Sequence, residues 1–361
     1  MTQRILISTG GSGGHVVPAT VLYDHLKDKF NVTISIDHRG IKFLDKNKYN
    51  LEIFNVSQIS KNIFLLPFQF LLMIYLIIKS IFFLKKKKFD IIISTGGYMS
   101  LPLCIASKIM NIKIFLFEPN MVLGRSNKFF IKYCEKIICY SNKIKNFPSR
   151  YQNKINIIPA LLRKKFYGAK KAEVINEYIN LLIIGGSQGA KIFDTLLKTS
   201  IVKLSKRYSL KIFQQTNSVN FENLKNFYKN NNIDYELFDF NEDISNLMSK
   251  ANMCLTRAGA STLAELVFLN LPCVAIPLPT SKDNHQFENA FFYNENGCNW
   301  ILNQNEINDE TLVNELVNII DNKDEYLIKK TNMKNFSYQN TWNNINQKII
   351  SVINENRISK N

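Results

Sequence analysis

The stretch TGGSGGHVVP, residues 9–18, places four glycines and one histidine between an apolar run and a helical pattern. The apolar run covers residues 4–8, and the helical pattern puts Leu22 and Leu26 on one face, with Pro18 tolerated in the first turn. A glycine turn at this point lets a phosphate group approach the N–H groups at the start of the helix. The stretch therefore predicts the first strand, turn and helix of a nucleotide-binding type of α/β domain.

A second stretch of the same design, GGSQGA at residues 185–190, opens the second half of the chain. In both halves, apolar strands alternate with helical patterns, which is typical of parallel sheets covered on both faces. We therefore predict an α/β protein with two Rossmann-like domains that face a cleft. The N-terminal domain is expected at residues 1–160 and the C-terminal domain at residues 178–361, with the option that the last helix packs back on the N-terminal domain. A linker is expected at residues 161–177, where the apolar periodicity lapses.

The composition restricts the class of partner. The chain has 361 residues and a net charge of +17, which is typical of proteins that meet nucleic acid or an anionic membrane, although a bias of the genome toward Lys, Asn and Ile gives the same charge. No finger spacing, helix-turn-helix or alternation of aromatic and basic residues occurs, so we expect no nucleic-acid partner. The six cysteines form no CxxC pair and the four histidines no i, i+4 pair, so we expect a cytoplasmic, reduced protein without a metal site. The N-terminus enters a strand directly, without the pattern of a secretion signal.

One segment is apolar enough to meet a membrane. It runs from Ile63 to Leu84, is interrupted by Pro67, Gln69 and Lys79, and continues into four lysines that end at Lys88. About 20 apolar residues can span a bilayer, whereas an apolar helix beside a basic cluster is typical of a segment lying on an anionic surface. We favour peripheral docking on an anionic membrane through Ile63 to Lys88, and we keep a buried helix and a membrane span as alternatives.

Chemistry is expected where the strands end, because ligands bind outside the carboxyl ends of parallel strands. His15 follows the last glycine of the first loop, and the loops TGGYMS at residues 95–100 and FEPN at residues 117–120 should reach the same edge. A neutral imidazole there can remove a proton from an attacking hydroxyl group. The alternative for His15 is packing or capping at the helix start.

A dinucleotide site is a rival interpretation of the first loop. Gly11 and Gly13 fit the first two glycines of the dinucleotide fingerprint, and Asp37 stands where an acid would bind ribose. However, Val16 occupies the place of the third glycine, and the second half lacks the G-x-G pattern. We therefore disfavour binding of a nicotinamide cofactor.

Six stretches together resemble, in order and spacing, the signature loops of the MurG family of N-acetylglucosaminyltransferases. The similarity extends from about Arg4 to Asn289. The resemblance implies a B-type glycosyltransferase fold and an inverting hexosyltransferase of peptidoglycan synthesis. Such an enzyme moves N-acetylglucosamine from UDP-N-acetylglucosamine to O4 of the muramyl sugar of undecaprenyl-linked lipid I, which gives lipid II. The six stretches are TGGSGGHVVP, TGGYMSLP, FEPN followed by LGRSNK, GGSQGA, TRAGASTLAE and DNHQFENA.

The resemblance also implies a site and a location. The enzyme would lie peripherally on the cytoplasmic face of the plasma membrane. It would need no cofactor, and the absence of any Asp-x-Asp in the sequence leads us to expect metal-independent chemistry. His15 is our first choice for the general base and Glu118 our second. The residues implied for the donor are Ser187, Gln188, Gly189, Asn241, Arg257, Gly259, Thr262, Glu265, His285 and Gln286. Those expected for the acceptor and its phosphates are Ser12, Gly13, Gly14, Gly96, Gly97, Tyr98, Asn120, Asn127 and Arg163.

The individual roles follow from the same match. Ser187, Gln188 and Gly189 would meet the donor pyrophosphate, and Glu265 would accept both ribose hydroxyls, a task that suits a carboxylate. The backbone near Asn241 would read the uracil. Arg257 would follow the strand, and Gly259 through Thr262 would form the turn that offers N–H groups to phosphate. His285 with Gln286 would contact the sugar.

The chain departs from the family pattern at two loops. Phe117 and Pro119 stand in the place of the H and Q of H-E-Q-N, and residues 160–162 read ALL where the family has N-P-V before its arginine. These departures put the geometry of both loops in question. A UDP-N-acetylglucosamine 2-epimerase, a glycolipid glycosyltransferase of the same fold and a non-catalytic sugar-nucleotide-binding protein stay open as alternatives.

Overall fold

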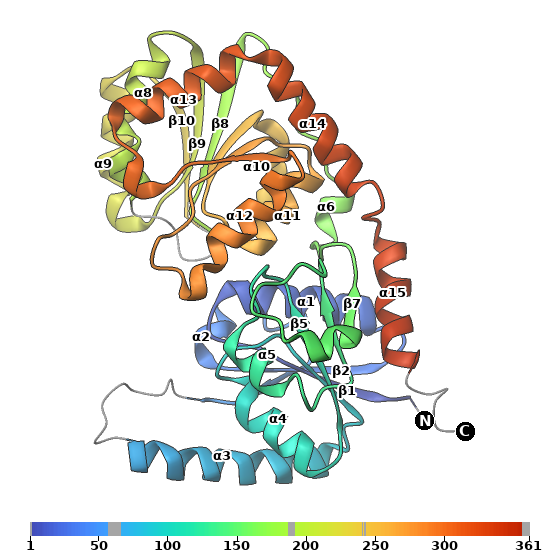
Figure 1. Ribbon diagram of the computed structural model, residues 1–361. Coiled ribbons are helices and arrows are strands. Elements are labelled where there is room, and N and C mark those ends of the chain that lie inside the picture. The colour runs from blue at the N-terminus through green and yellow to red at the C-terminus, as the bar shows by residue number, and fades with distance from the viewer. Residues whose placement is uncertain (1, 57–65, 187–191, 240, 242, 356–361) are drawn as a thin grey trace. The chain divides into compact units, whose positions relative to one another are not determined.

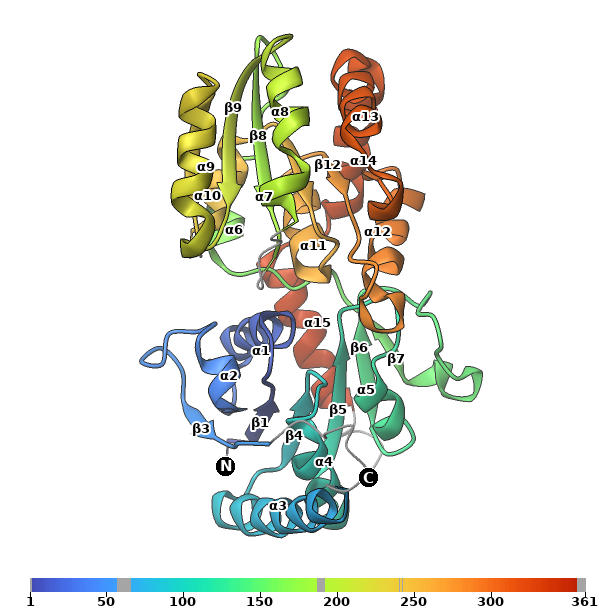
Figure 2. The ribbon, with the colours of Figure 1, turned by 90° about the vertical axis from the view of Figure 1, so that its left-hand side faces the viewer.

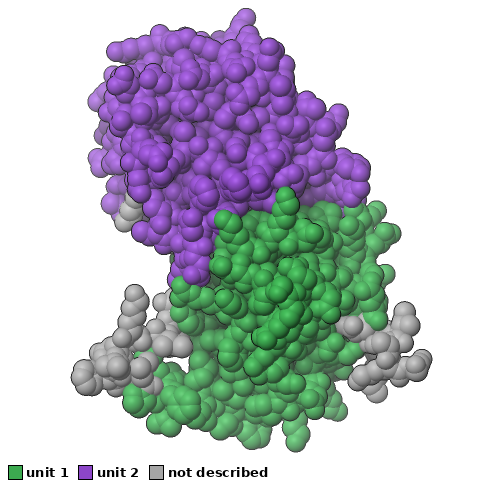
Figure 3. All heavy atoms as spheres, in the orientation of Figure 1, with its two compact units in different colours: residues 1–161, 342–361 green, residues 162–341 purple. Residues whose placement is uncertain are grey.

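The computed structural model describes residues 2–56, 66–186, 192–239, 241 and 243–355 (Figure 1). The chain divides into two compact units, which are coloured separately in Figure 3. Unit 1 contains residues 1–161 and 342–361, and unit 2 contains residues 162–341.

Unit 1 is built on a seven-stranded parallel sheet in the order β3-β2-β1-β4-β5-β6-β7. The central strand β1 (Arg4–Ser8) buries Ile5, Leu6 and Ile7 completely, as expected for a strand covered on both faces. The other strands are β2 (Asn31–Ile36), β3 (Leu51–Ile53), β4 (Ile91–Ser94), β5 (Lys113–Glu118), β6 (Lys136–Cys139) and β7 (Ile155–Ile157). Its helices are α1 (Gly13–Leu26), α2 (His38–Ile41), α3 (Leu66–Lys87), α4 (Ser100–Ile109), α5 (Arg125–Phe130), η2 (Ser149–Lys154) and α15 (Trp342–Asn354).

Unit 2 is built on a six-stranded parallel sheet in the order β10-β9-β8-β11-β12-β13. Its strands are β8 (Tyr178–Ile184), β9 (Ser209–Gln215), β10 (Asp234–Phe238), β11 (Met253–Thr256), β12 (Cys273–Ala275) and β13 (Asn299–Ile301). Its helices are α6 (Lys165–Gly168), α7 (Phe193–Leu196), α8 (Lys198–Ser205), α9 (Ser218–Asn230), α10 (Ile244–Lys250), α11 (Ala260–Phe268), η3 (Lys282–Asn284), α12 (His285–Glu295), η4 (Gln304–Glu306), α13 (Asp309–Asp321) and α14 (Lys323–Ser337).

The two sheets confirm the predicted fold class. In each unit the strand order reverses beside the strand that precedes a glycine loop: β1 lies between β2 and β4, and β8 lies between β9 and β11. Ligands of open α/β sheets bind at such switch points, outside the carboxyl ends of the strands. The first glycine loop, and Gly185 and Gly186 at the start of the second, therefore lie where the fold favours binding.

The last described helix, α15, belongs to unit 1, which agrees with the option that the last helix packs back on the N-terminal domain and ends the C-terminal unit at Thr341 instead of residue 361. This helix buries Ile345 and Ile349 completely and packs against α1, beside which Figure 2 shows it. At its start, Trp342 stacks on His25 of α1, with the ring centroids 3.7 Å apart and the ring planes at 23°. An apolar face of this kind has to be buried, and α1 supplies the surface.

The segment expected as a linker, residues 161–177, also differs from the expectation, because unit 2 begins at Leu162. Ala172 donates its N–H to the carbonyl of Leu269 at 2.8 Å, and Lys330 donates to the carbonyls of Ala172 and Asn270, both at 2.8 Å. The regular element in this described segment is the short helix α6, which is too short to produce an apolar periodicity.

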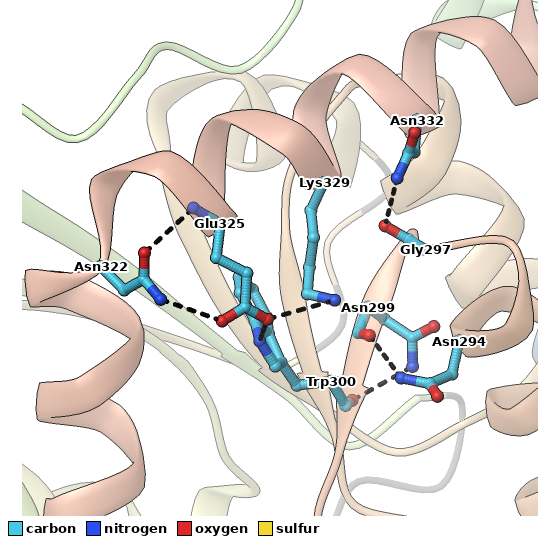
Figure 4. A network of polar contacts seen from close by, with 8 residues as sticks. All are labelled: Asn294, Gly297, Asn299, Trp300, Asn322, Glu325, Lys329 and Asn332. Carbon is cyan, nitrogen blue, oxygen red and sulfur yellow. Dashed lines mark hydrogen bonds and ion pairs between the residues drawn. The ribbon is translucent and has the colours of Figure 1, made fainter.

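A polar network holds α14 against β13 (Figure 4). The indole N–H of Trp300 donates to Glu325 at 2.7 Å, and the ammonium group of Lys329 lies 3.6 Å from the same carboxylate. The Lys329 ammonium also lies 4.7 Å from the centre of the Trp300 ring. The network fixes the helix that leads the chain out of unit 2.

Candidate active site

The first glycine loop is tied to the end of β2 by a buried carboxylate. Oδ1 of Asp37 accepts hydrogen bonds from the N–H groups of Gly11 at 2.8 Å and Gly40 at 2.9 Å. A side chain at Gly10 would put Cβ 2.7 Å from the same oxygen and 2.6 Å from Cγ of Met99, so only glycine fits there. Asp37 is thus used to shape the loop, which weighs against the dinucleotide interpretation that assigned it to ribose.

His15 lies in the first turn of α1 and is oriented by the loop after β4. Its Nδ1 atom lies 2.7 Å from the carbonyl oxygen of Thr95. Because a carbonyl only accepts, Nδ1 carries the proton, and the lone pair of the neutral ring is on Nε2. This tautomer suits a general base that acts through Nε2.

The glycines of the second loop pack against that imidazole. Gly96 and Gly97 have φ values of +88° and +81°, a region that favours glycine. A Cβ atom on Gly96 would lie 3.5 Å from Cε1 of His15, and one on Gly97 would lie 3.7 Å from Nε2. The loops after β1 and β4 therefore meet at His15, as the sequence predicted.

Glu118, the other candidate base, ends β5 and is buried. Its Oε1 atom accepts from the N–H of Asn120 at 3.2 Å and from the amide of Asn120 at 3.0 Å. Its Oε2 atom accepts from the N–H of Gly124 at 2.8 Å and from the amide of Asn127 at 3.0 Å. An ionised carboxylate has about four acceptor positions, so these four donors use all of them. Burial raises the pKa of Glu118, and the four hydrogen bonds lower it.

This geometry gives Glu118 the task of holding the loop at residues 118–127 and favours His15 as the base. The departures from the family pattern do not undo the loop. Phe117 is buried and packs edge-on against Tyr140, with centroids 5.7 Å apart, and its carbonyl accepts from the amide of Asn127 at 3.0 Å. The aromatic ring at position 117 is part of the core of unit 1, and Glu118 keeps its polar partners.

The remaining predicted acceptor residues of unit 1 belong to the loops after β1 and β4. Ser12 is the N-cap of α1, and Gly13 and Gly14 are the first residues of that helix. Tyr98 is half-buried in the turn that follows Gly97. Backbone N–H groups of the first helical turn have no partner within the helix and are suited to an anion.

In unit 2, the first part of the donor loop is fixed by β9. The N–H of Gly185 donates to the side chain of Gln215 at 3.1 Å, and Gly186 has φ = +76°. Ser187, Gln188 and Gly189 lie outside the described residues, so their predicted contact with the donor pyrophosphate stays a prediction.

Glu265 of α11 is paired with Arg163, which we had expected at the acceptor phosphates. Both residues belong to unit 2, and Nε and one terminal nitrogen of Arg163 lie 3.2 and 2.9 Å from the same carboxylate oxygen of Glu265. Burial raises the pKa of the Glu265 carboxyl, whereas the charge and hydrogen bonds of Arg163 lower it. The structure therefore places Arg163 among the predicted donor residues.

Other predicted donor residues follow β11. Arg257 is buried and donates to the carbonyl of Ile276 at 2.9 Å and to the side chain of Gln304 at 2.6 Å. Its guanidinium supports the neighbouring loops. Gly259 is the N-cap of α11, and residues 259–262, including Thr262, are partly accessible.

The start of α12 is connected to those loops. His285 lies 2.8 Å through Nδ1 from the carbonyl of Lys282, and Gln286 accepts from the N–H of Leu278 at 2.9 Å. Asn289 donates to the carbonyl of Ala258 at 3.1 Å, which joins α12 to the loop before α11. Asn241 accepts from the N–H of Asp243 at 2.7 Å, so it shapes its own turn.

Comparison with known proteins decides the family. Residues 5–139 match the glycosyltransferase family 28 N-terminal domain, and residues 180–347 match the C-terminal domain of the same family. A UDP-N-acetylglucosamine–N-acetylmuramyl-(pentapeptide) pyrophosphoryl-undecaprenol N-acetylglucosamine transferase of Pelagibacter ubique (strain HTCC1062) is 65% identical, over 99% of this chain and 100% of its own. The chain belongs to the MurG family, within glycosyltransferase family 28. The prediction from the sequence is confirmed.

More distant relatives agree. A transferase of the same name from Rickettsia bellii (strain RML369-C) is 32% identical, over 89% of this chain and 91% of its own. The crystal structure of Acinetobacter baumannii MurG superposes with a TM-score of 0.77 at 22% identity, covering 98% of this chain and 100% of that one. A UDP-GlcNAc 2-epimerase from Neisseria meningitidis, bound to UDP-GlcNAc, superposes with a TM-score of 0.64 at 13% identity, covering 97% and 99%. Identities this low show the shared B-type fold alone.

Sequence reasoning missed one buried carboxylate of this family 28 chain. Asp194 of α7 accepts from the side chains of Gln214 at 3.0 Å, Thr216 at 3.1 Å and Asn220 at 2.6 Å. These contacts join the helix after the donor loop to the end of β9. A sequence signal was present, since an acid among apolar helical residues just after a glycine loop is unusual, but its partners come from later in the chain.

The apolar helix α3 of this MurG-family chain is mostly exposed, so the alternative of an ordinary buried helix is wrong. In its segment Pro67–Lys87, an 18-residue window has a mean hydropathy of 2.0, and only 17% of that window is buried. Among the described residues, this is the one helix long and apolar enough to cross a membrane. Phe68, Phe70 and Phe82 are 67–69% exposed, whereas Leu76 and Leu84 are buried. The helix packs on α4 through one side only (Figure 2).

In the part of the chain that the structure describes, no group of three or more His, Cys, Asp or Glu residues could hold a metal ion.

Proposed function

We propose that this chain is an inverting glycosyltransferase that moves N-acetylglucosamine from UDP-N-acetylglucosamine to O4 of the muramyl sugar of undecaprenyl-linked lipid I, which forms lipid II. The observation that carries the proposal is the 65% identity, over the full length, to a transferase named for these substrates. Independent support comes from the first glycine loop and from Gly185 and Gly186, which follow the strand at the switch point of each sheet.

In the proposed mechanism, His15 is the general base. Its Nδ1–H donates to Thr95, so Nε2 accepts the proton of the O4 hydroxyl as that oxygen attacks the anomeric carbon. The bond to the UDP oxygen breaks on the opposite face, which inverts the configuration. General-base catalysis of this kind contributes about 10²- to 10⁴-fold to the rate.

Phosphate binding is assigned to N–H groups at helix starts. Residues 12–14 at the start of α1 and the loop at Gly96 and Gly97 would hold the acceptor pyrophosphate, with Tyr98, Asn120 and Asn127 around them. Glu118 contributes by holding the loop at residues 118–127, which carries Asn120 and Asn127, in place. In unit 2, Ser187, Gln188, Gly189 and the start of α11 would stabilise the charge that develops on UDP as it leaves. Glu265 would bind ribose, Asn241 would lie near uracil, and His285 and Gln286 would contact the sugar.

The exposed face of α3 suits an enzyme whose acceptor carries a lipid. We place the protein peripherally on the cytoplasmic face of the membrane, with the exposed aromatic side chains of α3 in the interface and Lys85 to Lys88 on anionic headgroups. Lys87 forms an ion pair with Glu52. Lys85, Lys86 and Lys88 are therefore the lysines of the cluster that we assign to headgroups. The buried side of α3, through Leu76 and Leu84, keeps the helix attached to unit 1 and argues against a span.

The decisive experiment incubates the protein with UDP-N-acetylglucosamine and lipid I, and identifies the products by mass spectrometry. Formation of lipid II with release of UDP supports the proposal. Conversion of the sugar nucleotide to its 2-epimer without acceptor, or transfer to diacylglycerol in preference to lipid I, would replace it. Tight binding of UDP-N-acetylglucosamine without any turnover would indicate a non-catalytic sugar-nucleotide-binding protein.

A further inference from the structure

The Arg163–Glu265 pair has a geometry that a simple surface ion pair lacks. Nε and one terminal nitrogen of Arg163 both approach the Oε1 atom of Glu265, at 3.2 and 2.9 Å. The Glu265 side chain is only 8% exposed and that of Arg163 27%. The guanidinium carbon of Arg163 also lies 5.2 Å from the centre of the ring of Phe166, which is buried in α6. The arginine is therefore held on two sides.

This arrangement determines what each carboxylate oxygen can do. A carboxylate oxygen accepts about two hydrogen bonds, and Arg163 supplies two to Oε1. The second oxygen, Oε2, has the capacity for two further donors. Two neighbouring hydroxyl groups on one sugar ring are two such donors.

We propose that Arg163 is a positioning residue that turns the Glu265 carboxylate so that Oε2 receives the two ribose hydroxyls of the donor nucleotide. This inference rests on the proposed function, since it takes a uridine nucleotide as the ligand of unit 2. Arg163 also supplies the positive charge that a carboxylate needs in a buried place, because a buried charge without a partner is costly. Arg163 acts through Glu265 and so selects ribonucleotides over deoxyribonucleotides.

The experiment compares the full-length protein with its Arg163→Ala, Arg163→Lys and Glu265→Ala variants. Isothermal titration measures the affinities for UDP and 2′-deoxy-UDP, and NMR titration measures those for uridine and 2′-deoxyuridine. We expect the wild type to prefer UDP over 2′-deoxy-UDP by about tenfold or more, as for a hydrogen bond to a charged group. Arg163→Ala and Glu265→Ala should both reduce the preference to roughly threefold or less, and Arg163→Lys should restore part of it, because lysine keeps the charge but not the two-pronged geometry.

The nucleosides separate this role from direct binding of phosphate. If Arg163 contacts only phosphate, Arg163→Ala weakens UDP and 2′-deoxy-UDP equally and leaves the preference for uridine over 2′-deoxyuridine unchanged, which overturns the inference. A wild type without any ribose preference also overturns it. If Arg163→Ala does not fold, the ratio of the affinities for uridine and 2′-deoxyuridine in Arg163→Lys tests the inference instead. Failure of the proposed function gives a different result from failure of this inference: the preference for ribose is present, but lipid II does not form.

Discussion

Acid should loosen the contact between α1 and α15, because His25 is buried against Trp342 in its neutral form. Burial lowers the pKa of His25 from 6.5 to about 4, although the charge of Asp24 and the neighbouring side chain of Asn346 oppose the shift. In the unfolded chain the same imidazole takes up its proton near pH 6.5. Between these two values the unfolded state binds more protons than the folded state, so the free energy of unfolding falls as the pH falls.

The magnitude follows from the two pKa values. One pKa unit corresponds to 1.36 kcal/mol, so the shift from 6.5 to about 4 costs about 3.4 kcal/mol once the pH is below both values. At about pH 5 the loss relative to pH 7 is about 2 kcal/mol by the same linkage. His25 is only 3% exposed, so solvent screening reduces this cost little.

The assay is urea unfolding followed by tryptophan fluorescence at pH 7 and about pH 5. The chain has two tryptophans, Trp300 in unit 2 and Trp342 in unit 1, so a Trp300→Phe background reports on α15 alone. In that background, His25→Phe is the matched variant, because it keeps a ring against Trp342 and cannot titrate. Its stability should fall by about 2 kcal/mol less between the two pH values than that of the parent. An equal fall in both proteins would refute the reasoning, since other titrating groups are common to both.

Three further predictions concern catalysis and docking. His15→Ala should lower kcat by about 10²- to 10⁴-fold, with little change in the KM for UDP-N-acetylglucosamine. Glu118→Gln should mainly lower the melting temperature. If steady-state kinetics and thermal melts give the reverse result, the two residues exchange roles. Replacing Lys85, Lys86 and Lys88 together by alanine should weaken binding to vesicles rich in anionic lipid by roughly 100-fold, at about 1 kcal/mol per lysine, as measured by sedimentation; unchanged partitioning contradicts the docking model. Transfer to lipid I should continue in excess EDTA, and a loss that magnesium restores would show that the reaction needs a metal.

The sequence predicted those parts of the molecule that depend on neighbouring residues. Completely apolar runs such as residues 4–8 form central strands because a parallel sheet is buried on both faces. The glycine loops were identifiable because a strand, a turn and a helix follow one another directly. His15 was placed correctly beside the loop at residues 95–100, since strand ends of a parallel sheet share one edge.

The sequence did not predict side-chain pairs between distant segments that no strand-end rule brings together. Arg163 and Glu265 are 102 residues apart, and nothing near either residue indicates the other. Glu118 has the chemistry of a catalytic acid or base, and only the four hydrogen bonds that its carboxylate accepts show that it shapes a loop. The segment 161–177 looked like a linker because its helix, α6, has only four residues, too few to give a periodic apolar pattern.

The membership of α15 in unit 1 has a consequence for synthesis on the ribosome. Unit 2, residues 162–341, is continuous in the chain, whereas unit 1 needs residues 342–354 in addition to its N-terminal part. Domains fold as units during translation, so unit 2 can be complete before α15 has been made and has covered the α1 surface around His25. The nascent N-terminal part therefore exposes an apolar surface for as long as the whole of unit 2 is being translated, and this surface is where a chaperone would be needed.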